Sequence, residues 1–229
     1  MIGIIGAMKI EVDELKANIK EPIKEVISGI EYCAGNLYGK EVVVAACGIG
    51  KVNAAVCTQT MILKYKIDMI INTGIAGGMS PKINIGDIVI GSALVQHDVD
   101  TSPLGDPVGF ISGINRVEIP CTDSLIKKLE NAAGRIKGIK MHKGIIATGD
   151  QFIGEKEKLY KIVDRFGAIA CEMEGASIGH VCYINKVDFA VVRAISDNAD
   201  SESSMDYTEF QHIAAKNSIE MIKNFLMEE

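Results

Sequence analysis

Short apolar segments rich in isoleucine, valine and alanine alternate with helical patterns along the whole of this 229-residue chain. The first segment, Met1 to Gly6, ends in glycine and precedes an amphipathic pattern from about Ile10 to Ile19. Further strands are predicted over residues 31–37, 41–46, 68–72, 87–95, 144–148, 168–171 and 189–195. Further helices are predicted from residue 51, over residues 122–133, 155–166 and 175–183, and from about residue 206. This alternation predicts one three-layer α/β/α domain over residues 1–229, with a central mixed and twisted β-sheet.

Two segments carry local signals of their own. Asp206 and Glu209 stand at capping-box spacing, which predicts that the last helix starts near Asp206. The segment from His97 to Pro120 contains several glycines and prolines and has little periodicity. A connection of this length inside a domain is typical of a loop that serves function or an interface.

The charge balance and the cysteine pattern narrow the class of protein. The chain has 24 lysine and arginine residues against 30 aspartate and glutamate residues, a net charge of −6, and no basic cluster, which argues against a nucleic-acid partner. No apolar run is long enough to span a bilayer, and no basic region precedes the apolar N-terminus, so we expect neither a membrane anchor nor a signal peptide. The 6 cysteines form no C-x-x-C motif, and the 4 histidines lack metal-ligand spacing. We therefore expect a cytoplasmic protein without a metal site.

At several predicted strand ends an apolar segment gives way at once to glycine or to an ionisable group. These ends lie at residues 6–11, 48–53, 73–78, 171–174 and 193–197. An acid in the first turn of a helix often serves only as a cap. Five such ends together favour a shared ligand site, because open α/β sheets bind ligands beyond the carboxyl ends of their strands.

Two other catalytic or binding patterns deserve comparison with this site. Gly48 and Gly50 follow a strand as in a dinucleotide-binding turn, but Asn53 stands where that fingerprint needs a third glycine. The sequence from Gly175 to Gly179 fits G-x-S-x-G, with Asp197 and His212 following in the chain order of an α/β-hydrolase triad. The alternative interpretation of this second pattern, which we favour, is that small residues let a helix pack closely on the sheet.

The motifs at the strand ends resemble those of the bacterial 5′-methylthioadenosine/S-adenosylhomocysteine nucleosidases, within the purine nucleoside phosphorylase and nucleosidase superfamily. The resemblance rests on residues 4–8 with Glu11, and on residues 47–55, 72–78, 148–153, 172–174 and 193–200. These six motifs occur in the family's order over nearly the whole chain. Glu11 and the pair Met173 and Glu174 point to the nucleosidase branch. The resemblance implies a phosphorylase/hydrolase-like fold.

The resemblance also implies a reaction, the hydrolysis of the N-ribosidic bond of 5′-methylthioadenosine and S-adenosylhomocysteine. Such cleavage builds positive charge on the sugar and negative charge on the departing adenine, so it needs an acid at the base and a water at the ribose. The resemblance assigns the acid to Asp197, which would protonate adenine N7, and the activation of water to Glu11. No metal or organic cofactor is implied.

The same resemblance assigns the contacts to the substrate. Phe152 would stack on adenine, the backbone of Ile153 would read its Watson–Crick edge, Glu174 would accept hydrogen bonds from the ribose hydroxyls, and Arg193 would orient the carboxylates and the water. The apolar slot for the 5′-alkylthio group would be formed by Met8, Ile49, Met173 and Tyr207. The full set of implied substrate-binding residues is Met8, Ile49, Ile75, Ala76, Gly77, Phe152, Ile153, Glu172, Met173, Glu174, Arg193, Ser196 and Tyr207.

The implied partners are a small-molecule nucleoside and a second copy of the chain. By resemblance, the 97–120 loop of that copy closes the neighbouring 5′ slot, so we predict a homodimer. Two residues depart from the family's pattern. Ile75 stands where relatives commonly have a serine or threonine hydroxyl that helps to hold the catalytic aspartate, and Tyr207 stands where phenylalanine is frequent.

Three alternatives to this function remain at the level of the sequence. A phosphorylase of the same fold would use phosphate in place of water, but none of the 4 arginines lies in the first half of the chain, and Glu11 would repel a dianion. A nucleosidase for another 5′ substituent, of the adenosine or aminofutalosine type, differs mainly in the slot. A nucleoside-binding module without catalysis is the third, with Ile75 marking a relaxed site.

Overall fold

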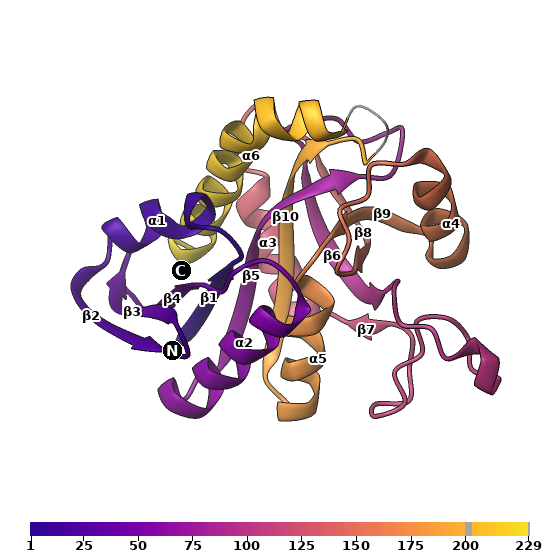
Figure 1. Cartoon of the computed structure of the whole chain (residues 1–229). Helices are drawn as coiled ribbons and strands as arrows, with labels where there is room; N and C mark the ends of the chain where they lie inside the picture. The colour runs from indigo at the N-terminus through magenta and orange to yellow at the C-terminus, as the bar shows by residue number, and fades with distance from the viewer. Residues whose placement is uncertain (200–202, 229) are drawn as a thin grey trace.

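Residues 1–199 and 203–228 are described by the computed structural model, drawn in Figure 1. Ten strands of this part of the chain form one mixed sheet in the order β10-β6-β8-β9-β5-β1-β4-β3-β2, with β7 paired to β6. The strands are β1 Ile2–Gly6, β2 Lys20–Ile27, β3 Ile30–Leu37, β4 Lys40–Ala46, β5 Met69–Gly78, β6 Ile88–Gln96, β7 Ile119–Pro120, β8 Met141–Thr148, β9 Ala168–Glu172 and β10 Asp188–Asp197. The helices are α1 Lys9–Ala17, α2 Lys51–Tyr65, the 3₁₀ helix η1 Ser102–Leu104, α3 Asp123–Ala133, α4 Lys156–Phe166, α5 Gly175–Asn185 and α6 Ser203–Leu226. Asp200, the last residue of the sixth motif, lies outside the described residues.

The middle of the sheet is parallel. β1 pairs with β4 on one side and with β5 on the other, and β5 also pairs with β10. From β10 the pairings continue through β6, β8 and β9 back to β5, so these five strands close into a ring. Because β1, β4 and β10 run in the same direction, the turns that follow them open on one edge of the sheet.

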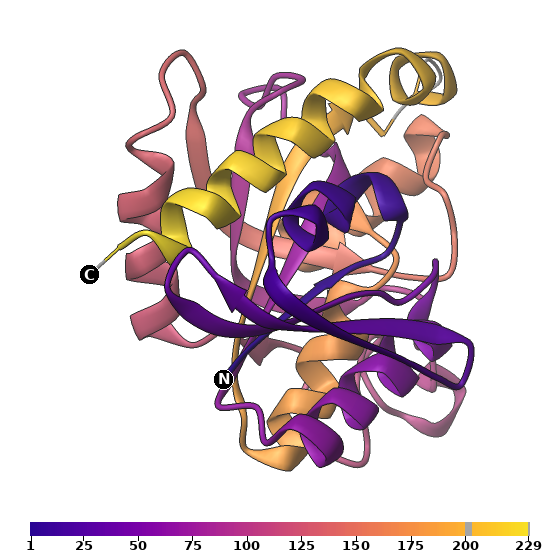
Figure 2. The ribbon, with the colours of Figure 1, turned by 90° about the vertical axis from the view of Figure 1, so that its left-hand side faces the viewer.

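Helices cover the sheet in two groups. α6 packs on β10 and β5 and also touches α1 and α3, while α2 and α5 pack on each other. Figure 2 shows α6 crossing the sheet beside α1, and Figure 1 shows α2 and α5 together away from α6. The predicted α/β fold, with its central mixed sheet between two helical layers, is confirmed.

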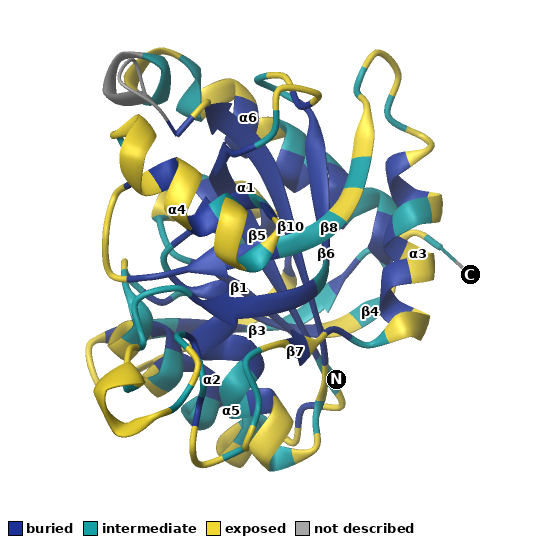
Figure 3. Ribbon diagram, turned by 90° about the vertical axis from the view of Figure 1, so that its right-hand side faces the viewer, coloured by how far each residue is buried: buried dark blue, intermediate teal, exposed yellow. Residues whose placement is uncertain are grey.

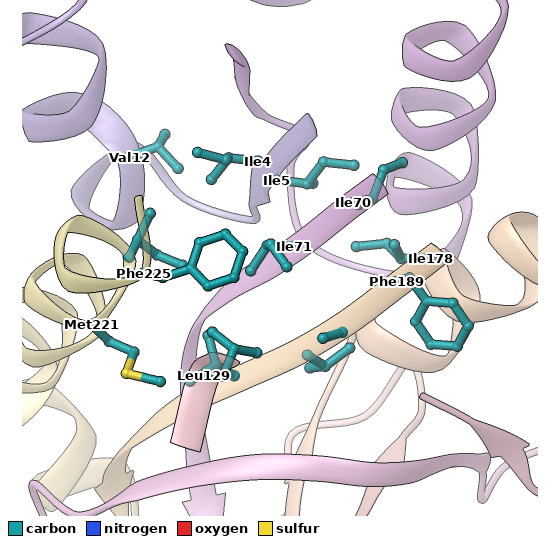
Figure 4. Packing of buried hydrophobic residues seen from close by; sticks show 14 of the residues in the cluster. Ile4, Ile5, Val12, Ile70, Ile71, Leu129, Ile178, Phe189, Met221 and Phe225 are labelled. Carbon is teal, nitrogen blue, oxygen red and sulfur yellow. The ribbon is translucent and has the colours of Figure 1, made fainter. Parts of the chain in front are cut away.

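The core beneath the strand ends consists of aliphatic side chains. Ile4 and Ile5 of β1 and Ile70 and Ile71 of β5 are fully buried, and Figure 4 shows them between residues of the flanking helices. Burying one such side chain contributes roughly 1.5–3 kcal/mol. Figure 3 shows that the central strands are buried along most of their length. The turns at the strand ends are therefore connected to strands that are held in a closely packed core.

Two strands were not predicted from the sequence, the two-residue β7 and the edge strand β2. β2 pairs only with β3, at the edge of the sheet, and its residues are almost all exposed. It contains Pro22, and two charged residues separate Ile23 from Val26, so it lacks the alternation that marks a strand with a buried face.

Some predicted boundaries were also wrong. α6 begins at Ser203, three residues before the predicted start, so Asp206 lies in its first turn and does not cap it. The predicted strand over residues 68–72 continues to Gly78, and the strand over 189–195 continues to Asp197. Glycines in β5 concealed this continuation, because glycine is a weak strand former. The 97–120 segment is largely irregular as predicted, apart from η1, β7 and an isolated bridge between Ile111 and Arg116.

Candidate active site

A cavity of about 470 Å³ lies beyond the strand ends that the sequence singled out. The turns after β1, β4 and β9, the second half of β5, the end of β10, the loop after β8 and the start of α6 all contribute to it. Its lining residues are Ala7, Met8, Glu11, Ile49, Ile75, Ala76, Gly77, Phe152, Cys171, Glu172, Met173, Glu174, Ser196, Asp197, Tyr207 and Thr208. Four of these are carboxylic acids.

Glu11 is held in the cavity by backbone amides. One carboxylate oxygen accepts hydrogen bonds from the amides of Ala7 (2.7 Å) and Met8 (2.8 Å), and the other accepts one from Ile75 (3.1 Å). A Cβ atom on Gly74 would lie 2.5 Å from the carboxylate, so this position must be glycine for Glu11 to fit. Burial raises the pKa of Glu11, although Arg193 and the amides oppose the shift. Glu11 therefore combines a fixed position with the proton affinity of a base.

Asp197 ends β10, where the pairing with β5 is irregular and Asp197 lies opposite Gly77. Its carboxylate accepts hydrogen bonds from the Ser196 hydroxyl (2.9 Å) and from the Ala199 amide (2.9 Å). A Cβ atom on Gly77 would lie 2.9 Å from one carboxylate oxygen, so glycine gives Asp197 room. Ile75 offers no hydroxyl, and the Ser196 side chain contacts Asp197 instead.

Glu174 occupies the N-cap position of α5, yet its side chain makes no hydrogen bond to that helix. The carboxylate instead accepts a hydrogen bond from the Gly50 amide across the cavity wall (2.8 Å). Gly50 has φ +98°, a conformation that favours glycine. Burial, followed by repulsion from Glu172, raises the pKa of Glu174 to about 8.

Glu172 and Arg193 form a buried ion pair beneath Glu174. The same Glu172 oxygen accepts the amides of Glu174 (3.0 Å) and Gly175 (2.6 Å), and the other oxygen accepts the Thr148 hydroxyl. Arg193 also donates to the Asn72 side chain (2.5 Å). Burial disfavours the charged guanidinium, but the carboxylates of Glu172, Glu174 and Glu11 outweigh it and raise the pKa of Arg193. Among the residues that the structure describes, Arg193 is the one buried Lys or Arg side chain, and it is committed to Glu172.

The other end of the cavity is apolar and more open. Ile49 is 52% exposed and Phe152 is 51% exposed. The ring of Tyr207 stands edge-on to that of Phe152, with centroids 5.8 Å apart, and its hydroxyl donates to the Met8 sulfur (3.3 Å). This end has the character of a slot for an apolar group.

Most of the predicted site residues meet in one place. All of them except Arg193 and Ile153 line the main cavity. Ile153 lines a smaller cavity that shares Gly77, Phe152 and Asp197 with the main one, while Arg193 is 1% exposed and lies under the carboxylates. Arg193 therefore reaches the site through Glu172, as its expected role of orienting the carboxylates requires, and its place among the residues that contact a substrate stays a prediction.

Some residues of the site were not predicted. Ala7, Cys171 and Thr208 line the cavity, and Asn72 and Thr148 hold the buried ion pair. Asn72 and Thr148 are polar residues within strands, where sequence gives no sign of their partners. The position of Thr148 at a strand end was the one available signal.

The competing patterns lie elsewhere or serve packing. Ser177 does not line the cavity, and its hydroxyl donates to the Lys51 carbonyl (2.6 Å). His212 lies on the exposed side of α6. A Cβ atom on Gly179 would lie 2.7 Å from Leu94, so the small residues of this motif let α5 approach the sheet, which was the favoured interpretation.

The described residues include neither a cluster of metal ligands nor a helix that could span a membrane. Within residues 1–199 and 203–228, no group of three or more His, Cys, Asp or Glu side chains could hold a metal ion. In the same part of the chain, no helix combines the length and the hydropathy needed to cross a membrane.

Comparison with known proteins agrees with this geometry. The phosphorylase superfamily model matches residues 1–227. The 5′-methylthioadenosine/S-adenosylhomocysteine nucleosidase of Shewanella sediminis (strain HAW-EB3) is 42% identical over 222 residues, which are 96% of each chain. The crystal structure of the nucleosidase of the same name from Neisseria meningitidis, in complex with methylthio-immucillin-A, has a TM-score of 0.95 at 33% identity and covers 99% of this chain and 98% of that one. The native structure of futalosine hydrolase of Helicobacter pylori strain 26695 has a TM-score of 0.93 at 36% identity, with coverage of 98% and 96%.

Proposed function

The chain belongs to the phosphorylase superfamily and, within it, to the 5′-methylthioadenosine/S-adenosylhomocysteine nucleosidases, and we propose that it hydrolyses the N-ribosidic bond of these two nucleosides. The products are adenine and either 5-methylthioribose or S-ribosylhomocysteine. The enzyme is an N-glycosyl hydrolase, and the residues present supply an acid and a base for it without a cofactor.

In this mechanism Asp197 donates a proton to N7 of adenine, and Glu11 accepts a proton from the attacking water. Glu11 suits a base because burial raises its pKa while three amides keep the carboxylate in place. Asp197 is held by the Ser196 hydroxyl, which fixes the direction from which it approaches the base. Both groups lie in the same cavity, so one bound nucleoside can meet both.

The remaining cavity residues divide between the parts of the substrate. Phe152 stacks on adenine beside the backbone of Ile153, and Glu174 accepts hydrogen bonds from the ribose hydroxyls, with Met173 along the sugar. Ala76 and Gly77 of β5 line the base end together with Asp197. Met8, Ile49, Met173 and Tyr207 form the slot for the 5′-alkylthio group.

The observation that carries the proposal is the charge of the cavity. Among the described residues that line it, none is lysine, arginine or histidine, while four are carboxylic acids. The neighbouring Arg193 is already bonded to Glu172 and Asn72. A phosphate dianion would meet repulsion without compensation, so water is the better nucleophile.

Release of adenine tests this proposal. Purified protein is incubated with 5′-methylthioadenosine, S-adenosylhomocysteine or adenosine, each with and without phosphate. We expect release from the first two substrates that does not depend on phosphate. Phosphate-dependent release would instead identify a phosphorylase, and tight binding with no release from any substrate would identify a binding module without catalysis.

A second candidate substrate class is supported by one comparison. Futalosine hydrolase of Helicobacter pylori shares the fold at 36% identity. A futalosine-type substrate would differ from 5′-methylthioadenosine at the 5′ end. Tyr207 and Thr208 add hydroxyls to the cavity that would hold this end. Comparing adenine release from aminofutalosine and 5′-methylthioadenosine at equal concentration decides between the two.

The homodimer and its cytoplasmic location belong to the same proposal. The face formed by α2 and α5 exposes apolar side chains, with Val52 and Leu63 74% exposed and Ile184 56% exposed. A second copy on this face would cover them and bring its 97–120 loop towards the open slot. The mass in solution, measured by light scattering, should be twice that of one chain, and Val52→Asp should lower it. The 6 cysteines are free and buried, as suits a reducing cytoplasm.

A further inference from the structure

The first amides of α5 are satisfied by side chains that do not belong to the helix. The amides of Glu174 and Gly175 donate to Glu172, and the Ala176 amide donates to the Thr148 hydroxyl (2.8 Å). Amides in the first turn of a helix have no partner inside the helix and need a cap. Glu172 and Thr148 together form this cap.

The Glu174 side chain lies beside this cap but takes no part in it. It sits at the N-cap position, where a side-chain oxygen commonly accepts an amide of the first turn. Its carboxylate makes no such bond and is turned to the Gly50 amide and the cavity. The cap formed by Glu172 and Thr148 is therefore what leaves the Glu174 carboxylate available.

The Thr148 hydroxyl makes two hydrogen bonds, and in each of them its role as donor or acceptor is determined by its partner. It accepts the Ala176 amide, so its single proton goes to the free oxygen of Glu172. The second Glu172 oxygen already accepts two amides and Arg193. Thr148 is fully buried and lies beside Glu172 in the register of β8 and β9. This hydroxyl consequently fixes the orientation of the Glu172 carboxylate.

We propose that Thr148 is a positioning residue: through the cap that it forms with Glu172, it sets the place of Glu174 and so the recognition of the ribose hydroxyls. The inference rests on the proposed function, in which Glu174 binds ribose. It assigns no contact between Thr148 and the substrate.

The test measures ribose recognition directly. The ratio of kcat/KM for 5′-deoxyadenosine to that for 2′,5′-dideoxyadenosine is determined for the wild type, Thr148→Val and Thr148→Ser. Valine keeps the shape and removes the hydroxyl, so we expect this ratio to fall by roughly tenfold, the effect of one lost hydrogen bond. Serine keeps the hydroxyl and should restore a ratio near that of the wild type. An effect on packing alone would lower both kcat/KM values equally and leave the ratio unchanged.

Thr58→Val is the matched control. Thr58 is also fully buried, and its hydroxyl donates to the Ala54 carbonyl within α2 (2.7 Å), away from the cavity. This variant loses a buried threonine hydroxyl and should keep the ratio of the wild type. If Thr148→Val does not fold, Thr148→Cys replaces it, because a thiol is a weak donor and acceptor, and a smaller fall in the same direction is expected.

An unchanged ratio in folded Thr148→Val, or an equal fall in Thr148→Ser, would overturn the inference. Failure of the proposed function is recognised separately, because the wild type itself would then release no adenine. In that case the same variants are compared by their binding of formycin A and 2′-deoxyformycin A, which lack an N-ribosidic bond. Loss of the preference for formycin A in Thr148→Val alone would still support the positioning role, and its retention would reject it.

Discussion

The two ends of the cavity differ in how firmly their side chains are held. At the buried end, Glu11, Asp197 and Glu174 are between 2% and 5% exposed, and each carboxylate accepts hydrogen bonds from the protein. At the open end, Ile49 and Phe152 are about half exposed, and contacts between side chains replace hydrogen bonds to the backbone. The groups that carry out the chemistry are thus fixed before the substrate binds, while the apolar groups that would contact adenine and the 5′ substituent are not.

This difference has a physical reason. Groups that stabilise charge in a transition state act best when they need no rearrangement during the reaction. The free energy needed to hold them in position is therefore supplied when the chain folds. An apolar slot gains only about 1–3 kcal/mol from each matching contact, and a slot completed by a second subunit can remain open until the subunits associate. We expect substitutions at the buried end to affect the rate and those at the open end to affect substrate binding and selectivity.

The largest effect is expected from the two proton-transfer groups. Glu11→Gln and Asp197→Asn each preserve shape and remove one group that can give or take a proton, so kcat/KM for 5′-methylthioadenosine should fall by about 10²- to 10⁴-fold. Adenine release and the circular-dichroism spectrum are measured on the same samples. A variant that keeps the native spectrum and nearly the wild-type rate would show that its residue has no such role.

A second prediction concerns the stability cost of the buried end. The pKa of Glu174 is about 8 in the folded protein against an ordinary value of 4.5, so the folded state holds an extra proton between these values. The free energy of unfolding must therefore decrease as pH rises through this window. Glu174→Gln does not titrate, and it should exceed the wild type in stability by on the order of a few kcal/mol at pH 9.

Chemical denaturation at pH 4 and pH 9 checks this second prediction. At pH 4, which lies below both pKa values, the carboxyl is mostly protonated in both states, and most of the advantage of Glu174→Gln should disappear. Glu157→Gln serves as the control, because Glu157 is exposed on α4 and pairs with Lys161. If Glu174→Gln is more stable than the wild type by the same amount at both pH values, the destabilisation by Glu174 does not come from its buried charge.

At the open end, Phe152→Ala should act mainly on binding. Loss of the stacking surface costs roughly 1–3 kcal/mol per base, which is about tenfold or more in kcat/KM, and most of it should be seen in KM. Tyr160→Ala is the control, since Tyr160 is an aromatic residue 65% exposed on α4 and does not line the cavity. A fall in kcat with unchanged KM would contradict the role of Phe152 as a binding surface and would place it with the buried end.

The sequence was informative about the two ends to different degrees. Glu11, Glu174 and Asp197 could be located because each follows an apolar strand, and parallel strands bring their ends together. Their supporting partners could not, because Asn72 and Thr148 are buried strand residues, and their hydrogen-bond partners depend on how the strands meet in the folded chain. The edge strand β2 was missed because nothing covers it, and the start of α6 was misplaced because the capping pattern at Asp206 falls inside the helix.

The smallest effect should come from Tyr207→Phe, and it provides the finest test of the difference between the two ends. The Tyr207 hydroxyl has one identified partner, the Met8 sulfur at 3.3 Å, and a thioether is a weak acceptor. Its removal should change kcat/KM for 5′-methylthioadenosine by no more than about two- to fivefold. Selectivity should shift towards apolar 5′ substituents, which is measured as the ratio of rates for 5′-methylthioadenosine and S-adenosylhomocysteine. A loss of a hundredfold or more would mean that this hydroxyl fixes the slot as firmly as the amides fix Glu11, and the two ends of the cavity would then be equally preorganised.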